Sequence, residues 1–423
     1  MADSVPVPAT CNVLVVGAGP AGSACAQLLA RAGIDTVLID AQVFPRDKVC
    51  GDGLIPDAHA ALQRLGVHDE VMAQAQRVRH VGCVGPRGGR IDVPGRLAVL
   101  RRRQLDDILC RAAQRAGAAF RAPLRFEARL LDSALVVGAR LRSGDTTHEL
   151  RARQVVLATG AVPQALIAAG LCQRRTPSAV ALRGYVHNPA MSDRITELEV
   201  VWHRRLRKGY GWIFPCRDSV FNIGVGLAHS HNHWVGGRQA MRDVNLREMF
   251  AAFCDVYAPA RTLMQGGTMV GELKGAPLRC SLDGARLSRP GLLVTGEAAG
   301  STYAFTGEGI GKAMETGMLA ARALVDARDA ARDAARDGAP LGEALDAAHA
   351  PYEAAIAALK PRFELYERAN RVNEHPWLAD LLIWRARRSP YILRRMAGVL
   401  DETSNPGSLV SVRGILKVLF PSR

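Results

Sequence analysis

Three glycines near the N-terminus have the spacing of a loop that binds the diphosphate of a dinucleotide. Gly17, Gly19 and Gly22 follow the apolar run NVLVVG, which is typical of a buried parallel strand. Asp40 ends a second apolar run, 18 residues after Gly22. The first glycine allows a tight turn, the second lets the backbone approach a pyrophosphate, and the third lets a helix pack on the strand. The helix N-terminus then offers amides to the phosphates, and the acid binds the ribose.

The elements that must position these residues are a strand, a helix and a second strand. We expect strands at residues 12–17 and 36–39, and between them a helix at residues 23–32 that ends at Gly33. This βαβ unit predicts dinucleotide binding through Gly17, Gly19, Pro20, Ala21, Gly22, Asp40 and Ala41.

The segment after Asp40 favours FAD over a nicotinamide dinucleotide. A nicotinamide dehydrogenase would continue with alternating strands and helices, whereas residues 44–53 (FPRDKVCGDG) contain turn formers and no helical period. Further buried strands are expected at residues 155–160 and 292–297, and helices at Arg102 and at residues 312–324. A sheet built from segments so far apart requires an inserted second domain, so we predict an α/β protein.

An aromatic pattern marks the inserted domain. Tyr210, Trp212 and Phe214 alternate along a predicted strand and therefore share one face. Further strands are expected around residues 185–186, 197–202 and 220–225. From the residues alone, a core role for these aromatics is favoured over a substrate tunnel, because aromatic stripes are more often core.

Length and composition limit the class of protein. The 423 residues allow two or three domains, and 48% hydrophobic with 22% charged residues exclude a disordered or fibrous chain. No apolar run approaches the ~20 residues of a membrane span, and the N-terminus lacks the basic region of a signal peptide. The 9 cysteines are scattered without a CxxC pair, which predicts reduced thiols in a cytoplasmic protein.

The net charge is +15, and nearly all of the basic residues are arginine. Basic residues are not interleaved with aromatics as in a nucleic-acid reader, so we predict no nucleic-acid partner. We favour an ordinary solvated, arginine-rich surface. The alternative is a weak attraction to anionic lipid. Three histidines at residues 229–233 could hold a metal ion, but no carboxylate supports them, so we predict a solvated loop and no metal.

Several motifs, taken in order, resemble the geranylgeranyl reductase family within the para-hydroxybenzoate-hydroxylase-fold flavoproteins. Residues 45–53 resemble the family's PxxKxCG segment beside the flavin, and residues 210–214 followed by a GxG pair resemble its YxWxF…GxG signature. Residues 296–300 with 307–310 resemble its second flavin motif, in which Glu297 stands where the family usually has Asp. The resemblance covers nearly the whole chain.

The resemblance implies an α/β fold with a Rossmann-type FAD-binding domain, an inserted mixed or antiparallel β-sheet substrate domain and a C-terminal helical region. We place the first domain at residues 10–75, 100–179 and 279–330, the second at 76–99 and 180–278, and the helical region at 331–423. The FAD contacts that the family implies beyond the glycine loop are Lys48, Cys50, Gly51, Arg102, Ala158, Thr159, Gly160, Gly296, Glu297, Gly307, Gly309 and Ile310.

The implied reaction is reduction of carbon–carbon double bonds in a hydrophobic, prenyl-type substrate, free or linked to a carrier or lipid, by hydride from reduced FAD. Cys50 and Tyr210 are the candidate catalytic residues, and Tyr210, Trp212 and Phe214 would line the substrate site. Because the chain has one dinucleotide fingerprint, NAD(P)H, a reductase or ferredoxin must deliver electrons transiently.

Other functions stay open on the sequence. The same scaffold supports hydroxylation, epoxidation or halogenation, and a flavin fold without catalysis could carry prenyl groups. The arginine-rich, amphipathic stretch after residue 376 favours a helical cap, with peripheral contact at the inner membrane face as the alternative.

Overall fold

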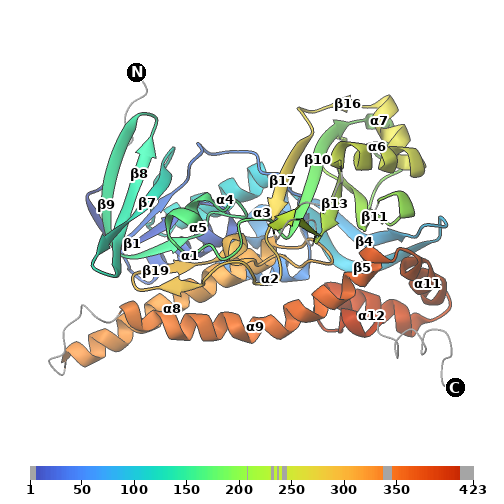
Figure 1. The fold of residues 1–423 in the computed structure, drawn as a ribbon. Coiled ribbons are helices and arrows are strands. Elements are labelled where there is room, and N and C mark those ends of the chain that lie inside the picture. The colour runs from blue at the N-terminus through green and yellow to red at the C-terminus, as the bar shows by residue number, and fades with distance from the viewer. Residues whose placement is uncertain are drawn as a thin grey trace.

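A mostly parallel sheet forms one end of the molecule (Figure 1). The computed structural model describes residues 6–206, 208–229, 233–235, 238–240, 245–336 and 345–409. In order of neighbours, this first sheet contains β18 (Ser288–Arg289), β19 (Leu292–Val294), β9 (Thr146–Leu157), β1 (Thr10–Val16), β2 (Thr36–Ile39) and β6 (Ala119–Arg121). All neighbours except β18 and β19 run parallel, and the hairpin of β7 (Arg125–Asp132) and β8 (Leu135–Ser143) extends from β9.

Helices and the hairpin bury both faces of this sheet. On one side α1 (Pro20–Arg31) packs between α4 (Arg102–Arg115) and α8 (Ile310–Arg336), while α5 (Gln164–Ala168) covers the other side with the β7–β8 hairpin. Helix α1 begins at Pro20, earlier than the predicted residue 23. Proline suits the first helical position, because an N–H there would have no acceptor within the helix and its absence costs no hydrogen bond.

The second sheet forms the other end of the molecule (Figure 1). Its neighbours in order are β16 (Thr268–Met269), β10 (Ala179–His187), β13 (Val220–Ala228), β12 (Gly209–Pro215), β11 (Leu198–Val201), β4 (Gln76–Val84), β5 (Arg90–Val99) and β3 (Gly53–Leu54), and β17 (Lys274–Leu278) pairs with β10. The β4–β11 pair is parallel and the other pairs are antiparallel. Residues 76–99 therefore share a sheet with residues 179–278.

One face of the second sheet is covered by α6 (Leu246–Val256) and α7 (Ala258–Gly266). Ile213 of β12 packs in the same cluster as Phe253 of α6, and a Cβ on Gly211 would lie 2.5 Å from the Phe253 ring. Since side chains alternate along a strand, the odd-numbered residues of β12 face the helices and the even-numbered residues face the opposite side.

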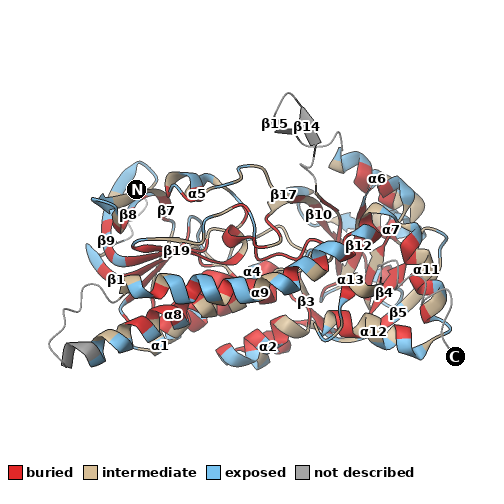
Figure 2. Cartoon of the chain, turned by 60° about the horizontal axis from the view of Figure 1, so that its bottom comes forward, coloured by how far each residue is buried: buried red, intermediate tan, exposed pale blue. Residues whose placement is uncertain are grey.

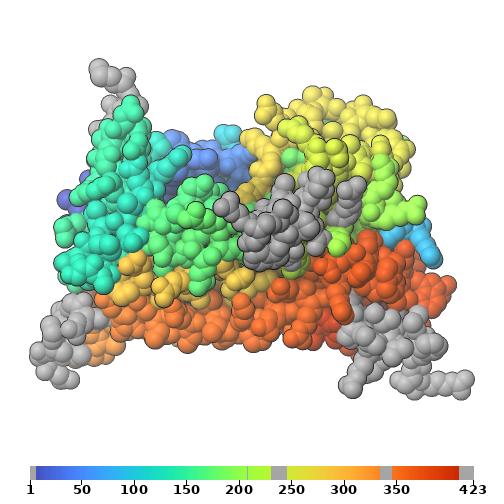
Figure 3. All heavy atoms as spheres, viewed as in Figure 1, coloured from blue at the N-terminus to red at the C-terminus, as the bar shows by residue number. Residues whose placement is uncertain are grey.

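The C-terminal helices connect the two ends of the molecule. In Figures 1 and 3 they form a band along one side, and Figure 2 shows α9 with one buried and one exposed face. They are α9 (His349–Ala369), α10 (Arg371–Glu374), α11 (Trp377–Ala386), α12 (Pro390–Leu400) and α13 (Pro406–Leu409). The Tyr352 hydroxyl donates to the Val294 carbonyl in the first sheet at 2.6 Å. Near the second sheet, Trp202 Nε1 donates to Asn373 Oδ1 at 2.7 Å.

The remaining α-helices and β-strands are short. They are α2 (Pro56–Leu65), α3 (His68–Gln74), β14 (His233–Val235) and β15 (Arg238–Ala240). The histidine motif at residues 229–233 lies largely outside the described residues, and the described part of the chain has no cluster of three His, Cys, Asp or Glu that could hold a metal ion. No helix within the described ranges is long and apolar enough to cross a membrane.

Candidate active site

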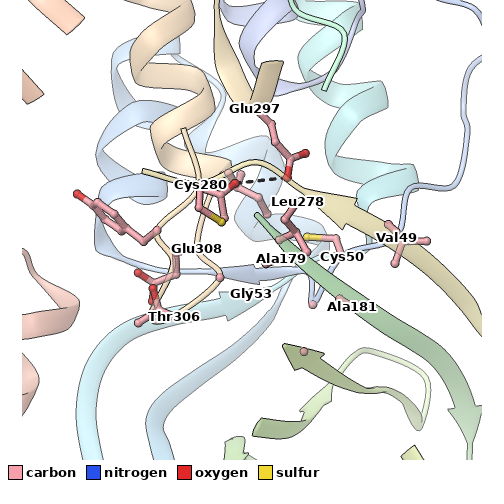
Figure 4. Close-up of a pocket in the computed structure, with 18 of the residues that line it drawn as sticks. Val49, Cys50, Gly53, Ala179, Ala181, Leu278, Cys280, Glu297, Thr306 and Glu308 are labelled. Carbon is pink, nitrogen blue, oxygen red and sulfur yellow. Dashed lines mark hydrogen bonds between the residues drawn. The ribbon is translucent and has the colours of Figure 1, made fainter. Parts of the chain in front are cut away.

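A single cavity of about 840 Å³ runs from the glycine loop to the second sheet and the C-terminal helices. It is lined by all of the predicted cofactor and substrate residues except Gly22 and Gly296, which lie just behind its wall. Figure 4 shows side chains of β10 and β17 together with those of Cys50, Glu297 and Glu308 around this space. Segments far apart in the sequence therefore converge on one site.

Two of the three glycines in the loop have no room for a side chain, and the third has. A Cβ on Gly17, whose φ is +101°, would lie 2.4 Å from the Ala158 carbonyl oxygen, and a Cβ on Gly22 would lie 1.8 Å from the Gly17 carbonyl oxygen. A Cβ on Gly19 would meet only guanidinium nitrogens of Arg46 and Arg102, at 3.7 and 3.8 Å. Only at Gly19, then, does the loop present free space beside positive charge.

Two carboxylates hold these arginines in place. Fully buried Asp106 accepts from Arg102 Nε at 2.7 Å and from Arg46 Nη1 at 2.9 Å. Asp40 Oδ2 lies 3.3 Å from Arg46 and accepts from the Ala18 amide at 2.9 Å. Guanidinium groups fixed in this way suit a diphosphate, so the residues around Gly19 fit the diphosphate of FAD. Arg46 was missed in the sequence, although it lies within the segment that resembles the family's flavin motif.

A second ion pair lies farther along the cavity. Lys48 Nζ is 3.6 Å from Glu297, which also accepts from the Thr302 hydroxyl at 3.4 Å (Figure 4). Glu297 therefore projects toward the cavity in spite of its extra methylene. Lys48 and Glu297 are placed where they could contact the cofactor beyond its diphosphate.

The aromatic residues of β12 line the cavity. The rings of Tyr210 and Trp212 are 6.2 Å apart, those of Trp212 and Phe214 are 6.4 Å apart, and Trp202 lies 6.3 Å from Tyr210. The rings of Tyr210 and Phe214 also pack against a core cluster that contains Trp202, whereas Gly211 and Ile213 on the other face of the strand pack against α6.

A buried polar network supports the segment around Cys50. Asp52 is fully buried and accepts from the Tyr185 hydroxyl at 2.5 Å and from Asn222 Nδ2 at 2.8 Å. Asn222 Nδ2 also donates to the Cys50 carbonyl at 2.8 Å, and its Oδ1 accepts from Trp212 Nε1 at 2.9 Å. Burial raises the pKa of the Asp52 carboxyl. This network ties the Cys50 turn to the aromatic strand.

Arg183 extends the network toward the cofactor segment. Its buried guanidinium lies over the Tyr185 ring at 4.1 Å and donates to Asp47 at 3.0 Å and to the Lys48 carbonyl at 2.9 Å. Sequence reasoning missed Asp52, Tyr185 and Arg183, because their partners are far apart in the chain.

The ionisable groups near Cys50 differ in acidity. The Tyr210 hydroxyl donates to the Thr306 carbonyl at 2.6 Å, and burial raises its pKa far above the ordinary value. Burial raises the pKa of Cys280 to about 12 and that of Glu308 to about 8. Glu308 was also missed, although it stands between two predicted cofactor residues.

Comparison with known proteins identifies relatives of the chain. Residues 10–209 match the family described as FAD binding domain. A menaquinone reductase from Mycobacterium tuberculosis is 35% identical over 335 residues, covering 75% of this chain and 77% of the relative. Digeranylgeranylglycerophospholipid reductase 1 from Methanopyrus kandleri is 28% identical over 321 residues, covering 75% of this chain and 80% of the relative.

A solved structure agrees with the fold. A protein described as geranylgeranyl bacteriochlorophyll reductase-like, from Thermoplasma acidophilum, superposes with a TM-score of 0.70 at 22% identity, covering 97% of this chain and 96% of that chain. The predicted α/β flavoprotein fold and the FAD cofactor are thus confirmed.

Proposed function

Because the chain belongs to the geranylgeranyl reductase family of FAD-dependent oxidoreductases, we propose that it reduces carbon–carbon double bonds of a hydrophobic, prenyl-type substrate. The relatives named above are reductases of menaquinone and of digeranylgeranylglycerophospholipid. The observation that carries the proposal is the continuity of the cavity, which joins the glycine loop to an apolar half lined by Tyr210, Trp212 and Phe214.

Bound FAD would supply the hydride in this reaction. Arg46 and Arg102 would hold its diphosphate at Gly19, Asp40 its adenosine ribose, and Lys48 with Glu297 its more distant part. The aromatic strand would exclude water and orient the alkene. Cys50 and Tyr210 both line the cavity, and we assign them to positioning the reacting double bond.

The test is an anaerobic single-turnover assay with menaquinone and with a geranylgeranyl lipid. The reduced enzyme should convert a substrate to a product heavier by two hydrogens without oxygen. A product that forms only with oxygen and gains one oxygen atom would contradict the proposal and favour a monooxygenase. The same assay, started from oxidised enzyme with NADH, NADPH or reduced ferredoxin, identifies the electron donor.

We further propose that the enzyme takes its substrate from an anionic lipid surface through α11 and α12. Trp377, Trp384 and Tyr391, here called the aromatic face, are 56%, 44% and 57% exposed. Arg388 lies 5.0 Å over the Trp384 ring and Arg395 lies 5.9 Å over the Tyr391 ring. Exposed aromatics beside arginines suit a membrane interface.

The opposite side of the same helices lines the cavity. Leu382 and Ile383 of α11 and Met396 and Leu400 of α12 contribute to its wall. The same two helices therefore carry both the exposed aromatic face and a part of the cavity wall. This geometry supports a peripheral position at the inner membrane face.

Vesicle sedimentation tests this surface. The protein should bind vesicles of phosphatidylglycerol with phosphatidylcholine, and bind less as salt is raised. Substituting Trp377, Trp384 and Tyr391 together by alanine should abolish binding. The matched control, Leu131→Ala with Ile167→Ala, removes apolar side chains that are 47% and 41% exposed on the FAD-binding side and should leave binding unchanged. Equal loss in both variants would contradict the assignment.

A further inference from the structure

Glu308 presents a carboxyl group to the cavity from a loop that is held in place. It stands between Gly307 and Gly309, directly before α8, and Figure 4 shows it near Cys280 and Thr306. The Tyr210 hydroxyl donates to the Thr306 carbonyl at 2.6 Å, and the Glu308 carbonyl accepts from the Tyr303 amide at 2.8 Å. These two bonds fix the backbone on both sides of Gly307, and with it the point from which the Glu308 side chain projects.

Glu308 differs from the other carboxyls of the cavity in its partners. The others are held by cations or by hydrogen-bond donors: Asp40 by Arg46, Asp47 by Arg183 and Lys274, Glu297 by Lys48, and Asp52 by Tyr185 and Asn222. Glu308 forms no ion pair within the described residues, and its ionised form is favoured by a hydrogen bond with Thr306 and by the charge of Lys312. Its negative charge is therefore compensated by fewer partners than that of the other cavity carboxyls.

The charged groups around Glu308 favour its protonated form. Asp57 of α2 and Glu402, which follows α12, both act on it with negative charge, and Lys312 of α8 acts with positive charge. Lys312 is already engaged, since its Nζ lies 2.6 Å from Glu315, 2.8 Å from Glu402 and 3.8 Å from Asp57. Burial, followed by the charge of Asp57, raises the pKa of Glu308 to about 8, so it carries a proton at neutral pH.

Two other groups that line the cavity, Cys280 and Tyr210, are poorer acids. Burial raises the pKa of Cys280 to about 12 and raises that of Tyr210 further. A general acid works best when its pKa lies near the working pH. Tyr210 also has a structural task, because its hydroxyl holds the Thr306 carbonyl.

We infer that Glu308 is the general acid of the proposed alkene reduction and that its Oε–H supplies the proton for the second new C–H bond. As the π bond breaks, one carbon receives the hydride from the reduced cofactor and the other receives the proton of Glu308. The resulting carboxylate then takes a proton from solvent. This inference rests on the proposed function.

The test compares Glu308→Gln with Asp57→Asn. Glutamine keeps the shape of glutamate but has no acidic proton, so FAD content should stay normal while oxidation of reduced enzyme by the prenyl substrate slows on the order of 10²-fold or more. The wild-type rate should fall as pH rises through about 8, and the Glu308→Gln rate should not change there. Asp57 does not line the cavity. Its neutral variant should keep the wild-type rate at low pH, where Glu308 is fully protonated, and move the fall to lower pH, because a negative neighbour is removed.

Infrared difference spectroscopy gives a readout that does not depend on turnover. The wild type should lose the carbonyl band of a protonated carboxyl as pH rises through about 8. The band of Glu308 should be absent from Glu308→Gln and present in Asp57→Asn, where it is lost at lower pH; the band of Asp57, whose pKa burial raises to about 7, should be missing only from Asp57→Asn. A Glu308→Gln variant with the wild-type rate and pH profile would overturn the assignment of the acid alone. A wild type that shows the band but reduces no prenyl substrate would overturn the proposed function, and the general acid with it.

Discussion

The two halves of the cavity are built from the chain in opposite ways. In the glycine-loop half, Gly17, Gly19, Gly22 and Asp40 come from one βαβ unit, so their spacing along the chain fixes their spacing in space. In the aromatic half, the lining comes from β10, β12, the loop before α8 and the C-terminal helices. The first half binds a common cofactor through local backbone geometry, whereas the second depends on the assembly of the whole fold.

The largest effects should come from substitutions in the glycine loop. One of them should prevent folding, and another should prevent FAD binding without preventing folding. Gly22→Ala places a Cβ 1.8 Å from the Gly17 carbonyl oxygen, so we expect little folded protein. Gly19→Val should fold, because Gly19 has an ordinary φ of −73° and its Cβ meets no backbone. It should nevertheless abolish FAD binding, since the side chain would occupy the place of the diphosphate.

Absorbance of bound flavin and circular dichroism after purification measure these two outcomes. Gly33→Ala is the control: its Cβ would meet nothing within 4 Å, although its φ is +72°. It should lose about 1 kcal/mol of stability from the left-handed backbone alone and keep its FAD. Normal FAD content in Gly19→Val would contradict the location of the diphosphate.

The next effect should appear in the buried network of the aromatic half. Asp52→Ala leaves the Tyr185 hydroxyl and one Asn222 donor without the acceptor they share. Unpaired buried groups cost about 1–3 kcal/mol, so we expect thermal unfolding at a clearly lower temperature. Asp107→Ala removes the ion pair with Arg111 on the outer side of α4, where Arg111 is 62% exposed, and should cost at most about 0.5 kcal/mol. Equal shifts in the two variants would mean that the network adds nothing to stability.

The same contrast explains how much could be predicted from the sequence. The parallel strands, the glycine loop and Asp40 follow from local apolar runs and fixed spacing. The shared face of Tyr210, Trp212 and Phe214 follows from strand alternation, but which face is the cavity does not, because Phe253 arrives on the other side from a distant helix. Asp52 and Glu308 stand inside recognisable motifs. The role of Asp52 depends on Tyr185 and Asn222, and that of Glu308 depends on Asp57. Each of these partners lies far in sequence from the residue it acts on, so no local pattern indicates these roles.

Glu308 should also affect stability in a pH-dependent way. Its pKa rises from 4.5 to about 8 on folding, so the folded chain holds a proton that the unfolded chain loses. Between these pH values the unfolding free energy contributed by this group therefore falls as pH rises. Glu308→Gln should remove that slope and be more stable than the wild type near pH 8, while losing activity. Urea unfolding at several pH values measures the difference, and an unchanged slope in the variant would show that Glu308 ionises normally.

The smallest effect should distinguish two neighbours on the aromatic strand. Trp212 donates to Asn222, which in turn holds the Cys50 carbonyl, so Trp212→Ala should lower kcat as well as raise KM. The Phe214 ring is half-buried, packs against the glycines of the Cys50 turn and lies near the Trp212 ring. Phe214→Leu should therefore raise KM about 3-fold to 10-fold through lost apolar contact and leave kcat unchanged, because it removes binding that substrate and transition state share. Steady-state kinetics with one prenyl substrate measures both constants. If Trp212→Ala changed KM alone, its bond to Asn222 would not position the catalytic turn, and the aromatic half of the cavity would act only as a wall.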